Sequence, residues 1–272
     1  MDPKAKNTYL IAGAAFVVFV VAIFFLFIFQ RSPKGPEAEE SAEEVKELSE
    51  VEIAKRPYIT LTPTTDGAEI IMSMENMSFC DKIEYELTYL ADNPQLAGEK
   101  IERGSTGTDI NAQEAKYKKS ILLGTGSRGV RSPDTGIEDG KLILHCFKAN
   151  VEFQSESDWN LLKGGAKKAK VSNKAGSIEV DVPALGKDHW IIVADTVGLP
   201  TGFDFDVKNA ILPSYSVSSV DVDKAGSGSL VWKLERDAGD VDLYVYNNAE
   251  AKWQKVDSKY DSSAKTLTAT VS

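Results

Sequence analysis

The stretch from Tyr9 to Phe29, YLIAGAAFVVFVVAIFFLFIF, constrains this chain most, because it holds no charged or strongly polar side chain. A helix of about 20 residues, rising about 1.5 Å per residue, spans a hydrocarbon core of roughly 30 Å. Fifteen residues of the stretch are Phe, Val, Ile or Leu, and each favours insertion by roughly 0.3 to 0.6 kcal/mol. A core helix would have a polar side, and a signal peptide would be shorter with a small-residue cleavage site. The sequence therefore predicts an uncleaved transmembrane helix over residues 9–29.

The orientation of this helix rests on a narrow balance of charge. Lys4 and Lys6 precede the helix, whereas Arg31 and Lys34 follow it. The positive-inside rule therefore gives nearly equal support to the two orientations. The preceding tail, residues 1–8, is short, and the long remainder has the strand pattern of modules common outside cells. We therefore expect the tail in the cytoplasm and the C-terminal part outside the membrane.

An acidic segment, residues 30–55, follows the predicted helix. It opens with two prolines and a glycine, which end the helix, and residues 37–55 carry eight glutamates among good helix formers. We interpret the segment as a solvated spacer. A short coiled-coil stalk is the alternative, although it would have fewer than three heptads. The alternative depends on three apolar residues on one helical face: Val45, Leu48 and Val51.

From Arg56 onward, apolar and polar residues alternate with the period of a β-strand. The clearest example is residues 82–90, where alternate side chains predict a strand with one buried face: Ile83, Tyr85, Leu87 and Tyr89. The run Trp190-Ile-Ile-Val-Ala is apolar throughout and predicts a strand buried on both faces. Further strands are predicted at residues 59–62, 68–74, 98–104, 116–123, 140–149, 150–155, 178–182, 213–221, 229–235, 241–247, 252–256 and 265–271.

Turn signals recur every 8–12 residues between these strands, which is the spacing of a β-sandwich. About 220 residues follow the helix and its charged neighbourhood, enough for two cores. We therefore predict two tandem immunoglobulin-like antiparallel β-sandwich domains, residues 56–157 and residues 158–272. The net charge of −10 argues against a nucleic-acid partner, which would meet a basic surface.

The two cysteines, Cys80 and Cys146, are candidates for a disulfide. Cys146 shares a strand face with Leu142 and Leu144, so it should point inward. Outside the cell, a bond between neighbouring strands would add roughly 2–4 kcal/mol of stability. Two buried free thiols are the alternative. The two cysteines and two histidines do not form the close pairs of ligands that a structural zinc site usually has.

Neither histidine predicts catalysis. His145 should point away from Cys146, whereas a catalytic Cys–His pair needs both groups on one side of a cleft. His189 has no partner visible in the sequence. The motif Gly124-Thr-Gly126-Ser-Arg-Gly129 matches G-x-G-x-x-G, but loop residues rather than a helix follow it. We interpret it as a glycine-rich hairpin, and we predict no catalytic or cofactor-binding residue.

Three acidic clusters could hold calcium, which prefers six to eight oxygen ligands. They are Asp204 with Asp206, Asp221 with Asp223, and Asp237 with Asp240 and Asp242. Solvent-facing acids on alternating strands explain them more simply, and only the last cluster is retained as a weak calcium candidate. Among the tryptophans, Trp190 and Trp232 are predicted in the core. Trp159 and Trp253 are better candidates for a surface that stacks against sugars.

Two stretches resemble known modules. Residues 80–160, with CDKIEYELTYLAD, ILLGTGSRG, GKLILHCF and SESDWNLL, resemble the immunoglobulin-like or fibronectin-like module of uncharacterised single-pass surface proteins from uncultivated bacteria. The tail, DLYVYNNAEAKWQKVDSKYDSSAKTLTATVS, is similar to β-sandwich modules of bacterial cell-surface proteins. GDVDLYV is also similar to the small sandwich appended to secreted peptidases, where such aspartates can bind calcium. Neither resemblance implies a catalytic residue.

These patterns favour a membrane-anchored extracytoplasmic protein with a structural or recognition role, such as surface display, adhesion or envelope assembly, and no enzymatic activity. Its expected partners are the membrane and other surface proteins or envelope polymers. One alternative is a pilin-like filament subunit, which also joins an apolar N-terminal helix to a β-rich head. The other is a calcium-dependent carbohydrate-binding or enzyme-accessory module.

Overall fold

A computed structural model describes residues 44–164, 170–182, 185, 189–211, 213–220 and 227–271, with Asp109 described only by its backbone. The predicted tail, transmembrane helix and first part of the spacer (residues 30–43) lie outside these residues. Among the described residues, no helix has the length and hydrophobicity needed to cross a bilayer. Residues 44–272 belong to one compact unit.

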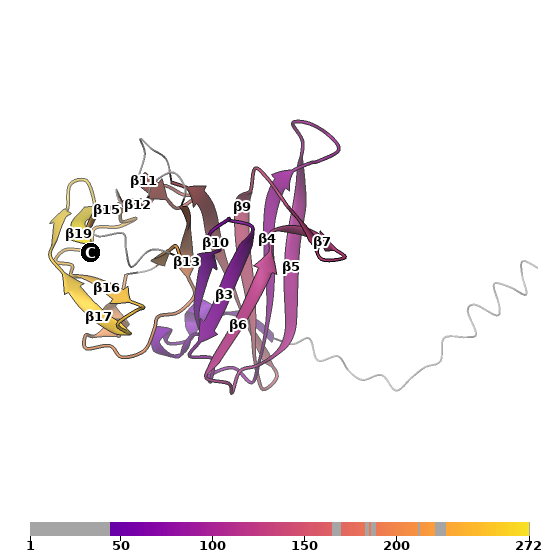
Figure 1. The fold of residues 1–272 in the computed structure, drawn as a ribbon. Helices are drawn as coiled ribbons and strands as arrows, with labels where there is room; N and C mark the ends of the chain where they lie inside the picture. The colour runs from indigo at the N-terminus through magenta and orange to yellow at the C-terminus, as the bar shows by residue number, and fades with distance from the viewer. Residues whose placement is uncertain are drawn as a thin grey trace, which may run out of the picture. The chain divides into compact units, whose positions relative to one another are not determined.

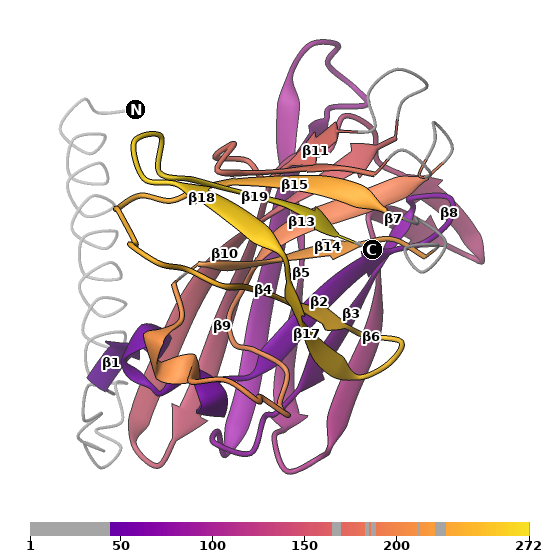
Figure 2. The same cartoon turned by 90° about the vertical axis from the view of Figure 1, so that its left-hand side faces the viewer.

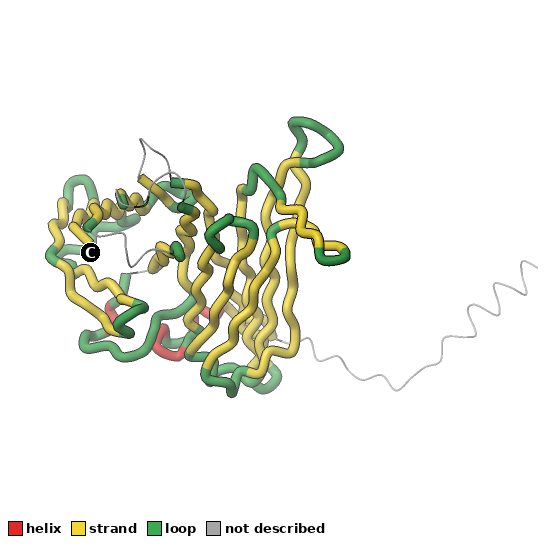
Figure 3. Tube along the Cα trace, in the orientation of Figure 1, coloured by secondary structure: helices red, strands yellow, loops and turns green. Residues whose placement is uncertain are grey.

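The described part of the chain is all-β, consistent with the predicted β-sandwich class (Figure 3). Its helical segments are three short 3-10 turns: η1 (Leu48–Glu50), η2 (Ile53–Lys55) and η3 (Val207–Asn209). Strands form because alternating apolar and polar residues, many of them β-branched or aromatic, suit a pleated surface with a buried face.

A seven-stranded sheet, here called the central sheet, takes part in most of the contacts between strands of the fold (Figure 1). Six strands pair in the order β14-β13-β10-β9-β4-β5, and β1 adds to β10 in parallel. Their bounds are β1 (Glu44–Glu47), β4 (Lys82–Asp92), β5 (Lys100–Asn111), β9 (Glu138–Lys148), β10 (Val151–Lys163), β13 (Trp190–Thr196) and β14 (Ser214–Ser218).

Two further sheets supply the strands that pack against the central sheet. The first outer sheet contains β2 (Tyr58–Pro63), β3 (Glu69–Glu75) and β6 (Lys116–Leu122). The second outer sheet runs in the order β11-β12-β15-β19-β18, with β11 (Lys170–Ser172), β12 (Ile178–Asp181), β15 (Gly228–Lys233), β18 (Ser258–Asp261) and β19 (Thr266–Val271). Two hairpins complete the fold: β7 (Gly124–Ser127) with β8 (Val130–Pro133), and β16 (Leu243–Asn247) with β17 (Lys252–Val256).

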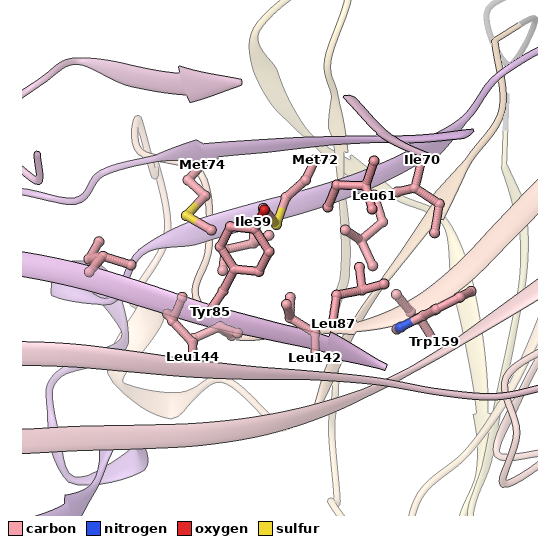
Figure 4. Close-up of a cluster of buried hydrophobic side chains, with 14 of the residues drawn as sticks. Ile59, Leu61, Ile70, Met72, Met74, Tyr85, Leu87, Leu142, Leu144 and Trp159 are labelled. Atoms are coloured by element: carbon pink, nitrogen blue, oxygen red, sulfur yellow. The ribbon is translucent and has the colours of Figure 1, made fainter. Parts of the chain in front are cut away.

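The first core lies between the central sheet and the first outer sheet (Figure 4). Met72 and Met74 of β3 meet Leu142 and Leu144 of β9, and all four are at most 2 % exposed. The alternation predicted for residues 82–90 is confirmed, because its four apolar side chains all lie in this core: Ile83, Tyr85, Leu87 and Tyr89.

The second core lies on the opposite face of the same sheet. Ile191 and Val193 of β13 enter it together with residues of β11, β12, β15 and β19. Their neighbours Ile192 and Ala194 enter the first core instead. The predicted burial of this run on both faces is therefore confirmed. In Figure 1, the C-terminal strands β15 and β19 lie on one side of β13, and β4, β5 and β9 lie on the other.

The predicted boundary between the two domains, at residues 157 and 158, lies inside β10. This strand pairs with β9 through its first part and with β13 through its last part. The central sheet thus continues without interruption through that boundary. The division of the chain into two tandem domains stays a prediction.

Residues 44–56, which we call the N-terminal strap, differ from the solvated spacer that we expected there. β1 pairs with β10 over four residues, and Leu48, Val51 and Ile53 are at most 8 % exposed. The guanidinium of Arg56 donates to the backbone oxygens of Val51 (2.7 Å) and Ser49 (2.6 Å). The expectation rested on charge, but the apolar residues in this segment gain more from burial than the glutamates lose, since the glutamates point outward.

Ile53 reaches a small aromatic cluster that includes side chains of the β16–β17 hairpin. Figure 2 shows β17 of this hairpin in yellow and β1 of the strap in indigo. There Trp253 of β17 packs beside Phe203 and Phe205, with ring centroids 5.8 and 5.3 Å apart. Tyr58, just after the strap, meets Tyr246 of β16 edge to face at 6.3 Å. The strap therefore joins the start of the described chain to the β16–β17 hairpin.

We expect replacement of Leu48 by alanine to lower the free energy of unfolding by about 2–5 kcal/mol, because it leaves a cavity in the first core. The matched control is Val45→Ala, three residues earlier, where the side chain is 58 % exposed and the change should stay within about 0.5 kcal/mol. Urea unfolding of the full-length chain in detergent micelles measures both. Equal, small effects would return the segment to a solvated spacer.

Candidate functional site

Asp195, near the end of β13, has a strongly raised pKa and faces a second carboxylate. Trp159 pairs with Ala194 in the β10–β13 ladder, so Asp158 and Asp195 form the next opposed pair. On its other side, Asp195 pairs with Tyr215 of β14. Alternation places Asp195 on the face that carries Ile191 and Val193, toward the second core.

The turn between β11 and β12 covers this position. Asn173 organises the turn, since its side-chain oxygen accepts from the backbone N–H of Ser177 (2.9 Å) and of Ile178 (3.2 Å). The hydroxyl of Ser177 lies 2.8 Å from that of Tyr215. We call Asp158, Asn173, Ser177, Asp195 and Tyr215 the junction cluster, because it joins the central sheet to the second outer sheet.

Burial, followed by the facing Asp158 carboxylate, raises the pKa of Asp195 to about 6. Hydrogen bonds from the Asp158 backbone and the Asn173 side chain oppose this shift only in part. Within the described residues, the Oδ1 atom of Asp195 is buried and accepts no hydrogen bond. Such a carboxyl can hold or exchange a proton near neutral pH.

The space near this pair is too small for an organic substrate. A cavity of about 10 Å³ lies beside it, toward the first core, lined in part by Ile59, Leu61, Trp159 and Ala194. That volume suits about one water molecule. The arrangement therefore suits the binding of a proton.

A second polar cluster surrounds His145 on the central sheet. Its Nδ1 atom lies 2.6 Å from a carboxylate oxygen of Glu152, and its Nε2 atom lies 3.7 Å from Glu86. The two glutamates hold the ring in place from neighbouring strands. Cys146 points to the opposite face and is bonded to Cys80, so no Cys–His pair forms. His189 directly precedes β13, and its backbone oxygen accepts from Gly164 (2.8 Å).

Cys80 and Cys146 are joined by a disulfide, with Cα atoms 5.4 Å apart and both side chains fully buried in the first core. The bond links the residue just before Asp81 and β4 to the neighbouring strand β9. It closes a loop across 66 positions of sequence. It therefore cross-links β9 to the chain just before β4.

Two of the three retained calcium candidates are engaged in other contacts, and the third, Asp240, is exposed. Asp237 accepts from the Tyr260 hydroxyl (2.8 Å) and the Gly239 N–H (3.2 Å), and these bonds lower its pKa. Asp242 pairs with Lys255 at 2.7 Å. Asp206 accepts from the Lys208 N–H at the start of η3, whereas Asp221 and Asp223 lie outside the described residues. Within the described ranges, no three His, Cys, Asp or Glu side chains gather as metal ligands.

The interpretation of Trp159 and Trp253 as surface residues is wrong. Trp159 is 2 % exposed because Gly140, its partner on β9, leaves room for the ring; an added Cβ would lie 2.3 Å from it. Trp253 is 8 % exposed, and its ring N–H donates to the backbone oxygen of Pro200 (3.1 Å). Trp190 and Trp232 are partly buried against the first and second cores.

The glycine motif at 124–129 forms the β7–β8 hairpin, as interpreted from the sequence. The junction cluster, in contrast, was missed. Its signal in the sequence is an aspartate that follows the apolar run of β13 at a position where alternation points into a core. Its partners come from three other segments, and no local pattern brings them together.

Comparisons with protein-family models, with curated proteins and with solved structures found no match to this chain.

We expect the double variant Cys80→Ala/Cys146→Ala to lose about 2–4 kcal/mol of unfolding free energy, since the unfolded chain regains the freedom that the closed loop removed. Urea unfolding with and without reductant measures the loss. Reductant should destabilise the wild type to a similar extent and leave the double variant unchanged. A reductant effect on the double variant, or none on the wild type, would contradict the cross-link.

Proposed function

We propose that this chain is a single-pass, membrane-anchored extracytoplasmic protein whose all-β part recognises or organises other surface components without catalysis. The observation that carries the proposal is the Cys80–Cys146 disulfide inside the first core. Disulfides form and persist in oxidising compartments and are rare in the cytosol. A disulfide buried in a core is suited to a structural role.

The apolar stretch over residues 9–29 supplies the proposed anchor, and the strap limits how far the β-sheets extend from it. Because residues 44–56 pack into the unit, residues 30–43 alone would bridge the membrane and the sheets. Fully extended, these 14 residues span at most roughly 50 Å. In this proposal, the sheets are held near the membrane surface and present their solvent-facing strands to neighbouring molecules.

The solvent-facing side of β4, β9 and β10 is the surface that we propose for recognition. It carries opposite charges in pairs, such as Lys82 with Glu84 (3.0 Å), and the half-buried His145 cluster. Flat polar sheet faces of this kind suit contacts with proteins or envelope polymers more than capture of small molecules, which need a concave pocket. The role is therefore one of adhesion, display or envelope assembly.

The proposal is tested by alkylating thiols in intact cells that produce the full-length chain. After denaturation without reductant, we expect neither cysteine to react with a maleimide reagent, and both to react once reductant is added. The chain should also sediment with membranes. The control is a variant lacking residues 9–29, which should stay in the cytoplasm with both thiols reactive.

Thiol alkylation and membrane sedimentation test separate parts of the proposal. Reactive thiols in a membrane-bound chain would place the sheets on the cytoplasmic side and overturn the extracytoplasmic assignment. A full-length chain in the soluble fraction would overturn the anchor instead.

A further inference from the structure

The junction cluster brings an ionisable side chain to the contact between two layers of the fold. Asp195 faces Asp158 on β10 and Tyr215 on β14, while Asn173 of the β11–β12 turn interacts with its carboxylate. Val171 and Ile178, at either end of this turn, are buried in the second core against Ile191 and Val193. The state of Asp195 therefore bears directly on how tightly the turn packs.

The charges around this carboxylate are mainly negative. On β10, Asp158 and Glu156 lie near the cluster; on the β11–β12 turn, Lys174 pairs with Asp139 (2.8 Å) and interacts more weakly with both of these acids. Lys141 of β9 bonds to Glu156. Glu235, after β15, acts on Tyr215 together with Asp195. Lys174 and Lys141 thus pair with other carboxylates, and neither neutralises Asp195.

The cost of a negative charge here has two parts. The Oδ1 atom of Asp195 is buried without a hydrogen bond from the described residues, so the charged form loses solvation that the hydrogen bonds from the Asp158 backbone and the Asn173 side chain replace only in part. The charged form also faces Asp158 across adjacent strands, where like charges repel. The neutral acid has neither cost, and its proton gives it a donor for a neighbouring oxygen.

We propose that the contact between the β11–β12 turn and the central sheet is a proton-operated latch, which is closed when Asp195 is neutral and loosens when Asp195 carries its charge. The movable part is Lys170–Asp181, the β11–β12 hairpin, in which β11 is the edge strand of the second outer sheet and β12 pairs with β15. Three pairs join β11 to β12. The hairpin also contacts the central sheet through Asn160, whose side chain donates to the Ser172 backbone (3.3 Å).

The direction of the pH response follows from the raised pKa. Ordinary aspartate ionises near pH 3.8, whereas Asp195 in the folded chain ionises at about 6. The neutral carboxyl stabilises the closed latch fully below about pH 4, and this contribution is lost as the pH rises through about 6. The latch is therefore tight in mildly acidic surroundings and looser at pH 7.5.

The test is hydrogen exchange, read by mass spectrometry, on the full-length chain in detergent micelles. Wild type is compared with Asp195→Asn at pH 7.5 and at pH 5.0, so that intrinsic exchange rates cancel at each pH. At pH 7.5, we expect backbone amides of Lys170–Asp181 to exchange about tenfold more slowly in Asp195→Asn, after allowance for solvent screening at this partly exposed site. At pH 5.0, where the wild-type carboxyl regains part of this contribution, the difference should shrink to about three- to fourfold.

The matched control is Asp257→Asn, at an exposed aspartate between β17 and β18, which should leave the exchange of this hairpin unchanged at both pH values. Equal exchange in wild type and Asp195→Asn at pH 7.5 would overturn the latch. If Asp195→Asn loosens the whole fold, Asp158→Asn decides, because it removes the facing charge and leaves Asp195 in place. We then expect a smaller difference in hairpin protection between pH 5.0 and 7.5 than in wild type, and an unchanged difference would also overturn the latch.

Discussion

The fold depends on β13, a strand whose two faces belong to different cores. Ile192 and Ala194 pack with the first outer sheet, whereas Ile191 and Val193 pack with the second. All four side chains are at most 3 % exposed. A strand of this kind cannot shift by one residue without exchanging its two sets of side chains. It therefore fixes the register of β10 and β14, on which both outer layers rely.

Like β13, the N-terminal strap contributes side chains to two apolar clusters. Leu48 and Val51 enter the first core, and Ile53 enters the aromatic cluster with Leu199 and Trp253. One short segment thus contacts side chains from both ends of the sequence. If residues 9–29 anchor the chain as proposed, a pull on them would act first on the strap, where four β1–β10 pairs and three buried side chains resist it.

The sequence predicted those strands whose burial leaves a pattern in consecutive residues. The alternation at 82–90 and the apolar run at 190–194 identified the two most informative strands, because burial on one or both faces leaves a direct pattern. β1 was missed because glutamates at 44 and 47 mask a four-residue strand that only β10 stabilises. Trp159 and Trp253 were misplaced because their burial depends on Gly140 and on the Pro200 loop, which are distant in sequence.

The two cores also differ in how they are held. The first contains the disulfide, which ties β9 to the start of β4. The described part of the second core has no covalent cross-link, and it meets the central sheet through the junction cluster as well as through apolar contacts. Local opening costs least where few bonds hold a segment, so motion should concentrate at the β11–β12 edge. In the proposed latch, the Asp195 carboxyl faces this edge from β13 and changes charge near pH 6. It thus acts on a hairpin that lacks a covalent cross-link, from a sheet that contains one.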